Sequence, residues 1–249
     1  MSGHSKWSTI KRKKGVKDAA RSKVFSKLIK EITVAARMGG GDVEGNPRLR
    51  LVVSKARDAN MPAENIKRAI QKGAGELEGV SYEEIVYEAY GPGGVALIIE
   101  TMTDNRNRTV GEVRHALDRK GGKLGNAGSV AHLFETKGYI VVESEGQEED
   151  SVMSVVLDAG AEDSKSEDGI FEIFTGPNDL HTVADALQAA GIAYVSAELA
   201  RIPSMTVELE GKNAQTMLVL MEALEDLDDV QKVYANFDMS DEEMAKAEA

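Results

Sequence analysis

The chain has 249 residues, of which 42% are hydrophobic and 29% charged, proportions that are ordinary for a soluble globular protein of two or three domains. It contains no cysteine, which excludes disulfides, a thiol nucleophile and thiolate metal ligands. No apolar run is long enough for a transmembrane helix, and no apolar region follows the basic N-terminus as in a secretory signal. We therefore expect a cytoplasmic protein with no membrane partner.

Charge is distributed very unevenly along the chain. Residues 1–72 contain 18 Lys and Arg against 6 Asp and Glu, whereas the remaining residues contain 12 and 36. The net charge of −12 thus combines a basic first part with a strongly acidic remainder. Such asymmetry is typical of a chain that binds a polyanion at one end, so we expect nucleic acid to contact the first part and to be repelled by the rest.

The first 21 residues are polar and basic, and we predict that they form a flexible arm. Contacts to about 6–10 phosphates would weaken binding about 10³–10⁵-fold between about 50 and 200 mM salt. Trp7 lies among the cations of the arm, where it would stack on an unpaired base or pack on its own protein. The arm carries seven cations: Lys6, Lys11, Arg12, Lys13, Lys14, Lys17 and Arg21.

Three helices are predicted between residues 22 and 76, because apolar residues recur at helical spacing with cations on the outer faces. The first covers 22–38 and ends at a run of three glycines. Asn46 and Pro47 are typical of an N-cap and first helical residue, and a third helix begins near Pro62. We expect a small three-helix bundle followed by a glycine-rich linker. The third helix adds further charge through Lys67, Arg68 and Lys72.

Beyond residue 80 the pattern changes to alternating strands and helices. In chain order, we predict strands at 82–90 and 95–103, a helix at 105–120, strands at 129–135 and 138–143, a helix at 148–159, strands at 162–166 and 170–175, a helix at 177–190, strands at 192–201 and 205–210, a helix at 213–226 and a strand at 230–237. An acidic tail covers 240–249.

The order of these elements predicts an α+β protein. Residues 137–202 have the order β-α-β-β-α-β of a split βαβ unit. Residues 80–136 together with 204–239 have the elements for a second unit of this type, interrupted by the first. We therefore expect an N-terminal three-helix bundle at 22–76 and two ferredoxin-like α/β domains, the third domain being inserted in the second.

The candidate nucleic-acid-binding residues outside the arm lie on the bundle and at one strand–helix junction. That junction, 103–109, is dense in polar donors, and a helix cap explains Asp104 or Asn105 but not its two arginines. These arginines have RNA, protein or nearby carboxylates as alternative partners. The loops at 39–41 and 121–125 are favoured as plain turns, with a minor phosphate contact at most. The candidates are Lys23, Lys27, Lys30, Arg48, Arg50, Arg57, Arg106 and Arg108.

No pattern for catalysis is present. The four histidines lack the spacing of a zinc site, and there is no nucleophile elbow. The acidic pairs Glu83-Glu84 and Asp228-Asp229 are adjacent, so on a strand their side chains would face opposite sides. We expect no catalytic residue, no metal, no cofactor and no small-molecule substrate.

Several ordered motifs show that the sequence resembles the YebC family over essentially its whole length. The resemblance implies a three-domain, largely bacterial and cytoplasmic protein without a family-wide catalytic residue. The motifs are Met1-Ser2-Gly3-His4-Ser5-Lys6-Trp7, Lys11-Arg12-Lys13-Lys14, Gly39-Gly40-Gly41-Asp42, Asn46-Pro47-Arg48-Leu49-Arg50, Asn60-Met61-Pro62, Tyr90-Gly91-Pro92-Gly93-Gly94 and Thr103-Asp104-Asn105-Arg106-Asn107-Arg108-Thr109.

Two functions follow from the resemblance, because bacterial members are described as probable DNA-binding transcriptional regulators and a mitochondrial branch activates translation. Our leading hypothesis is a DNA-binding transcriptional regulator. The alternative is a ribosome-associated translation factor that binds ribosomal RNA or transfer RNA through the same basic N-terminal region. A third hypothesis, a small-molecule sensor or enzyme, would need a pocket with convergent polar groups and a perturbed acid.

Overall fold

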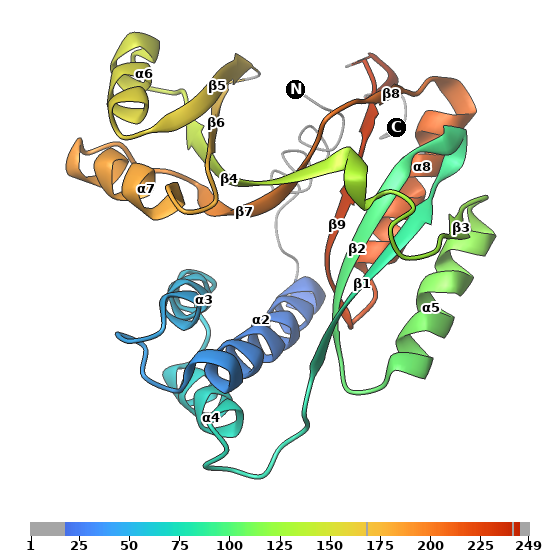
Figure 1. The fold of residues 1–249 in the computed structure, drawn as a ribbon, viewed down its shortest axis with the longest axis horizontal. Helices are drawn as coiled ribbons and strands as arrows, with labels where there is room; N and C mark the ends of the chain where they lie inside the picture. Colours follow the sequence, from blue (N-terminus) through green and yellow to red (C-terminus); the bar gives the residue numbers. More distant parts are fainter. Residues whose placement is uncertain (1–17, 168, 241, 245–249) are drawn as a thin grey trace.

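The computed structural model describes residues 18–167, 169–240 and 242–244. Its elements form three bodies around a central region: a helical body, a sheet with helices α5 and α8, and a second sheet with helices α6 and α7 (Figure 1). The fold class is α+β, as expected. Three separate hydrophobic clusters, one in each body, accord with the expected division, whose boundaries stay a prediction.

The helical body is the predicted bundle, in which α3 and α4 pack on α2. Its helices are α2 (Asp18–Gly39), α3 (Pro47–Asp58) and α4 (Ala63–Gly73). Helix α2 begins at Asp18, so Arg21 belongs to this helix and not to the predicted arm. Asn46 caps α3 as predicted: its Oδ1 accepts the Leu49 N–H at 3.1 Å. Its Nδ2 donates to the Ala35 carbonyl at 2.9 Å, which ties the cap to α2.

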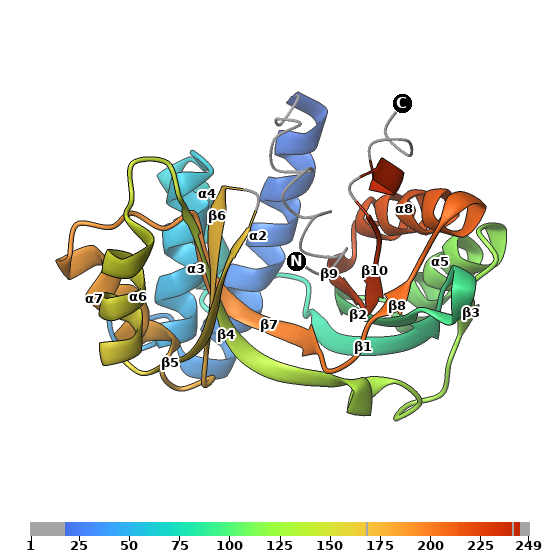
Figure 2. The same ribbon diagram turned by 90° about the horizontal axis from the view of Figure 1, so that it is seen from above.

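The first sheet has the strand order β3-β1-β2-β9 and is antiparallel throughout. Viewed from above, α5 and α8 lie on one face of it (Figure 2). The core beneath them includes Leu97, Ile99, Val113, Met217 and Leu220, all fully buried. The elements are β1 (Glu83–Tyr90), β2 (Ala96–Thr103), α5 (Arg106–Arg119), β3 (Lys123–Leu124), α8 (Gly211–Glu225) and β9 (Val230–Ala235).

One strand of this sheet differs from the prediction. The strand expected at 205–210 shortens to β8 (Val207–Glu208), which pairs in parallel with β10 (Phe237–Asp238) outside the main sheet. In the sheet, β1 lies beside β2 at the central position that a ferredoxin-like unit would give to the strand expected at 205–210. The five residues between β1 and β2 close a hairpin in which all eight residue pairs are in register, so local antiparallel pairing forms readily.

The second sheet has the order β5-β6-β4-β7 and the predicted β-α-β-β-α-β chain order, so it is a ferredoxin-like unit. Its core is formed by residues such as Ile140, Val156, Ile173 and Leu187. The elements are β4 (Phe134–Glu143), α6 (Glu149–Asp158), β5 (Ala161–Glu167), β6 (Ile170–Thr175), α7 (Leu180–Ala189) and β7 (Ser196–Pro203).

The predicted break between strands at 129–135 and 138–143 is wrong, because β4 is continuous from Phe134 and residues 131–133 form a short 3₁₀ helix. Gly138, at which the second of the two predicted strands begins, is a buried packing residue inside β4. A Cβ at this position would lie 2.1 Å from Thr175 Oγ1 and 2.9 Å from Leu180 Cβ. The glycine is therefore explained by close contact with β6 and α7, not by a turn.

The long strands β4 and β7 join the two sheets. A fourth hydrophobic cluster lies at their junction with β2 and β9 and includes Ile98, Phe134, Ala200 and Tyr234. The inserted unit is thus attached to the unit that contains it by a packed core as well as by the chain.

The packing role of Gly138 predicts that Gly138→Ala destabilises the protein. The added methyl group has no room against Thr175 and Leu180, and we expect a loss of about 1–3 kcal/mol in the free energy of unfolding. Gly111→Ala is the matched control, because Gly111 lies inside α5 with open space around its Cα. There we expect a gain of about 0.5–1 kcal/mol. Urea unfolding of both variants measures the difference, and equal effects would refute the packing argument.

Candidate nucleic-acid interface

Three of the predicted phosphate-binding lysines lie on one face of α2. Lys23, Lys27 and Lys30 are spaced i, i+4 and i+7, which places them in a row along the helix. We call this row the lysine face. It contacts residues 225–229, the acidic segment that joins α8 to β9. The structure therefore brings these lysines together, but against the protein's own acidic segment.

The N-terminal part of the lysine face contacts the C-terminal end of α8. Lys23 Nζ donates to Asp226 Oδ1 at 3.1 Å and to the Asp226 carbonyl at 3.3 Å. Lys27 Nζ donates to the Glu225 carbonyl at 2.8 Å. The last carbonyls of a helix have no partner within the helix and carry its negative dipole end, so cations are favoured at this position.

Lys30 forms the tightest contact of the lysine face. Its Nζ donates to the Asp228 carbonyl at 2.8 Å and to Asp229 Oδ1 at 2.5 Å. The side chains of Lys30 and Asp229 are only 11% and 3% exposed, whereas those of Lys23 and Asp226 are 45% and 63% exposed. The two ends of the lysine face are thus held very differently.

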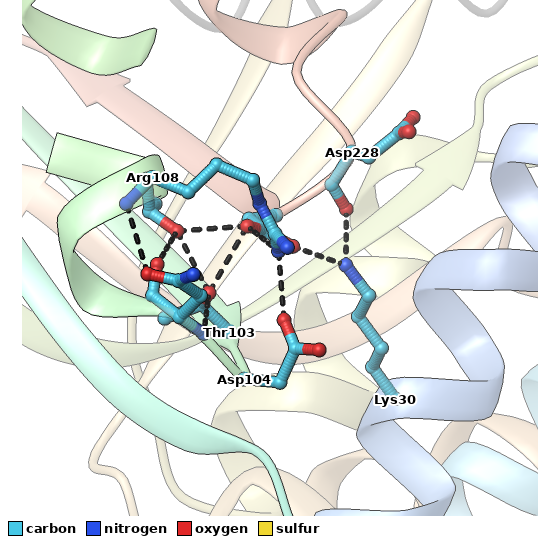
Figure 3. Close-up of polar contacts among 8 residues, drawn as sticks. Lys30, Thr103, Asp104, Arg108 and Asp228 are labelled. Atoms are coloured by element: carbon cyan, nitrogen blue, oxygen red, sulfur yellow. Dashed lines mark hydrogen bonds and ion pairs between the residues drawn. The ribbon is translucent and has the colours of Figure 1, made fainter. Parts of the chain in front are cut away.

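Asp229 connects the bundle to the body of the first sheet. Figure 3 shows the labelled residues of the two sides, Lys30 on α2 and Thr103 and Arg108 on the other body. Besides Lys30, its carboxylate accepts hydrogen bonds from Arg108 Nη2 at 2.6 Å, Thr109 Oγ1 at 2.7 Å and Thr103 Oγ1 at 3.0 Å. Burial by itself raises the pKa of this carboxyl, but the hydrogen bonds from Lys30, Arg108 and Thr109 outweigh it and lower the pKa to about 2. The carboxylate therefore stays ionised at neutral pH.

The polar segment 103–109 is the other side of this network. Asn105 caps α5 by accepting the Arg108 N–H at 3.1 Å, and Arg108 also pairs with Asp104 at 2.8 Å. Arg106 lies 3.5 Å from a Glu83 carboxylate oxygen. The sequence left RNA, protein or nearby carboxylates as alternative partners of Arg106 and Arg108. In the structure, both arginines lie beside carboxylates of the protein itself.

The remaining candidates of the bundle are also found, with different partners. Arg48 pairs with Glu84, and Arg50 donates to the Val43 carbonyl at 3.4 Å. Arg21 and Arg57 are exposed and have no ion pair within the described part of the chain. The other candidates of the arm lie outside the described residues: Lys6, Trp7, Lys11, Arg12, Lys13, Lys14 and Lys17.

Helix α4 carries three exposed cations that we did not select as binding residues. Lys67, Arg68 and Lys72 lie opposite the buried side of α4, which is formed by Ile66 and Ala69. Among the described residues, none of the three cations has an ion pair. The helical pattern of the sequence already placed these three cations opposite the apolar side of α4. No pattern in the sequence indicated that the lysines of α2 would be covered while the cations of α4 stay exposed.

The glycine-rich loop after α5 uses its N–H groups within the protein. The buried carboxylate of Glu88 accepts the N–H groups of Gly128 and Val130 at 2.6 Å and of Ala131 at 2.8 Å. Burial raises the pKa of Glu88, but these three donors outweigh it and lower the pKa overall. In the predicted turn 121–125 itself, the N–H groups of Gly122 and Gly125 donate to the Leu117 carbonyl at 2.9 Å and to the Glu88 carbonyl at 2.7 Å.

A cleft of about 860 Å³ lies where the three bodies meet. Glu198 on β7 joins all three, since it pairs with Lys55 of α3 at 3.0 Å and with Lys232 of β9 at 2.8 Å. The cleft has the size of a ligand pocket. Burial raises the pKa of Glu198, but the two lysines outweigh it and lower the pKa to about 2, so Glu198 is not suited to donate a proton at neutral pH.

Two further observations concern other kinds of site. Within the described residues, no three His, Asp or Glu side chains are grouped as metal ligands. None of the described helices is both long and apolar enough to cross a bilayer.

Fold and charge together define a three-body α+β protein with a basic helical first part, and known proteins share this plan. The model described as "TACO1/YebC protein N-terminal domain" matches residues 5–76, and the model described as "TACO1/YebC second and third domain" matches 82–237. The chain belongs to the TACO1/YebC family, which confirms the resemblance found in the sequence.

Similar proteins cover nearly the whole chain. A "Probable transcriptional regulatory protein" of Pelotomaculum thermopropionicum is 58% identical over 97% of this chain and 100% of its own length. A protein of the same description from Geobacter sulfurreducens is 58% identical over 99% of both. The crystal structure of a conserved hypothetical protein from Aquifex aeolicus has a TM-score of 0.84 and 48% identity, covering 90% of this chain and 93% of that one. The relatives' names support a regulatory role involving nucleic acid.

The network at Asp229 predicts that Asp229→Asn destabilises the protein in a pH-dependent way. The variant leaves Lys30 and Arg108 without their carboxylate, and we expect a loss of about 2 kcal/mol at pH 7. Because the folded-state pKa is lowered from 3.8 to about 2, this stabilisation is complete above about pH 4 and disappears as the pH falls toward 2.

Urea unfolding of the wild type and the variant between pH 7 and pH 2 measures this difference. Asp226→Asn is the control: its ion pair is exposed, so we expect a change below about 1 kcal/mol. A difference between wild type and Asp229→Asn that does not decrease at low pH would contradict the assignment.

Proposed function

We propose that this protein is a DNA-binding transcriptional regulator that binds the phosphate backbone through its basic N-terminal region. The observation that carries the proposal is the row of exposed cations on α4, Lys67, Arg68 and Lys72, which lack ion pairs in the described part of the chain. Arg21 and Arg57 on the same body are also exposed and have no such pair. Cations without a carboxylate partner are available for phosphate, and each phosphate contact releases a counterion.

The proposal is one of binding and not of catalysis, and it places the protein in the cytoplasm. The names of the relatives describe regulatory proteins. The ionised state of Asp229 and Glu198 suits structural ion pairs between the bodies more than proton transfer. The acidic remainder of the chain would keep the nucleic acid on the bundle by repulsion.

The alternative is a translation factor that contacts ribosomal RNA through the same surface. The composition of α4 favours it: the exposed face has three cations but only Asn65 as a fully exposed amide. Lys and Arg contacts to phosphate position a protein without reading sequence, and recognition by shape and backbone is common for folded RNA. Promoter-specific DNA readout would need more donors and acceptors at base edges.

Neutralising the α4 cations tests the proposed surface. In the triple variant K67Q/R68Q/K72Q, the slope of log affinity against log salt should become less steep by about two to three for duplex DNA, because up to three counterions are no longer released. Fluorescence anisotropy with a mixed-sequence duplex and a single-stranded RNA measures the slopes. The matched control is R114Q/R119Q/K212Q, since these cations are exposed on α5 and α8. Equal slopes for both triple variants would reject the surface.

The two targets are separated by comparing binding of the wild type to DNA and to ribosomes at one physiological salt concentration. A promoter-specific footprint without co-sedimentation supports the transcriptional role. Co-sedimentation with ribosomes that the α4 triple variant loses, without any footprint, supports the translational role.

A further inference from the structure

The lysine face of α2 is a row of cations whose acceptors are oxygen atoms of the protein itself. Lys23, Lys27 and Lys30 each contact an oxygen of the acidic segment 225–229, at successive positions along the helix. Along an α-helix this spacing amounts to steps of about 4.5–6 Å. Carboxylate and carbonyl oxygens of the segment thus accept from the same ammonium groups that a phosphate chain would contact.

We propose that the acidic segment is an autoinhibitory latch, which covers a phosphate-binding site on α2 and is displaced from Lys23 and Lys27 when nucleic acid binds. This inference rests on the proposed function, since it concerns regulation of the same basic body. It adds a second site to the α4 surface and gives the acidic remainder of the chain a role in that site.

The burial of the contacts determines which part of the latch opens. The pair Lys23–Asp226 is exposed on both sides, and exposed ion pairs contribute little, about 0–1 kcal/mol. The pair Lys30–Asp229 is buried and belongs to the network with Arg108. Removing one partner of such a pair is strongly unfavourable. The segment therefore opens from the Lys23 end, while Lys30 holds the bundle to the first sheet.

The opening end of the latch exposes two cations that share one face of α2. Lys23 and Lys27 are spaced i and i+4, so their side chains are neighbours one turn apart. A phosphate chain that displaces Asp226 from Lys23 would thus reach Lys27 next. Competition with the latch lowers the affinity for every polyanion. Only a polyanion that also makes strong contacts elsewhere on the protein therefore stays bound.

A double-mutant cycle tests the latch. Asp226→Asn should bind a mixed-sequence duplex DNA and a single-stranded RNA about threefold to tenfold more tightly than the wild type, because one exposed pair no longer competes. Lys23→Gln should change the wild-type affinity little, since Lys23 gains a phosphate only by losing Asp226. In the Asp226→Asn background, Lys23→Gln should abolish the gain. This non-additivity is the signature of competition.

The control for charge is Asp158→Asn. Asp158 is exposed at the C-terminal end of α6, so its loss changes the net charge equally at an equivalent position of another helix. If Asp226→Asn and Asp158→Asn bind the two nucleic-acid probes with the same affinity, the latch proposal is overturned. Additive effects of Lys23→Gln and Asp226→Asn would also overturn it.

A cross-link provides a second test that does not depend on charge. Because the chain has no cysteine, K23C/D226C can be joined specifically by a short bismaleimide. Closing the link should weaken binding of both probes relative to the same variant before cross-linking, since the segment then stays on α2. Unchanged affinity would mean that the segment does not open.

Failure of the latch differs from failure of the proposed function. If the wild type binds and the cycle is additive, only the latch is wrong. If neither the wild type nor Asp226→Asn binds either probe, the proposed function and the latch are both wrong. Binding by Asp226→Asn alone supports the latch in its strongest form.

Discussion

The position of the bundle against the first sheet depends on one buried carboxylate. Asp229 accepts hydrogen bonds from Lys30 of the bundle and from Arg108 and Thr109 of the first sheet, so it holds two bodies with a single charge. An ionised carboxylate is stable when buried only if its lone pairs are satisfied, and here the cations come from both sides. The orientation of the bundle is therefore tied to the electrostatics of one side chain.

Around this carboxylate, basic residues of the first part of the chain form ion pairs with acidic residues of the remainder. The basic first part and the acidic remainder meet at the lysine face, at Arg48–Glu84 and at Glu198, which pairs with Lys55 and Lys232. Charge asymmetry that suggests a polyanion partner is thus partly neutralised by the protein itself. Among the described residues of the bundle, the exposed cations without an ion pair, on α4 and at Arg21 and Arg57, stay available to a partner.

Local signals predicted the fold well. The cap at Asn46 and the helices of the bundle follow from interactions between residues close in sequence, and so does the split βαβ order of the inserted unit. The continuity of β4 through Gly138 was not predicted, because this glycine is explained by close contact with Thr175 and Leu180, which lie on other elements. The central place of β1 was missed for a similar reason: several strands have suitable patterns, and only pairing in space selects one.

By itself, the sequence determined most of the secondary elements, the fold class and the concentration of positive charge in the first part of the chain, because periodicity, caps and composition are local properties. Only the tertiary structure decided which cations are covered. Lys30 and Asp229 are 199 residues apart, and no local pattern records their contact. Whether a lysine faces solvent or a carboxylate depends on how the bodies pack, which is a property of the whole chain.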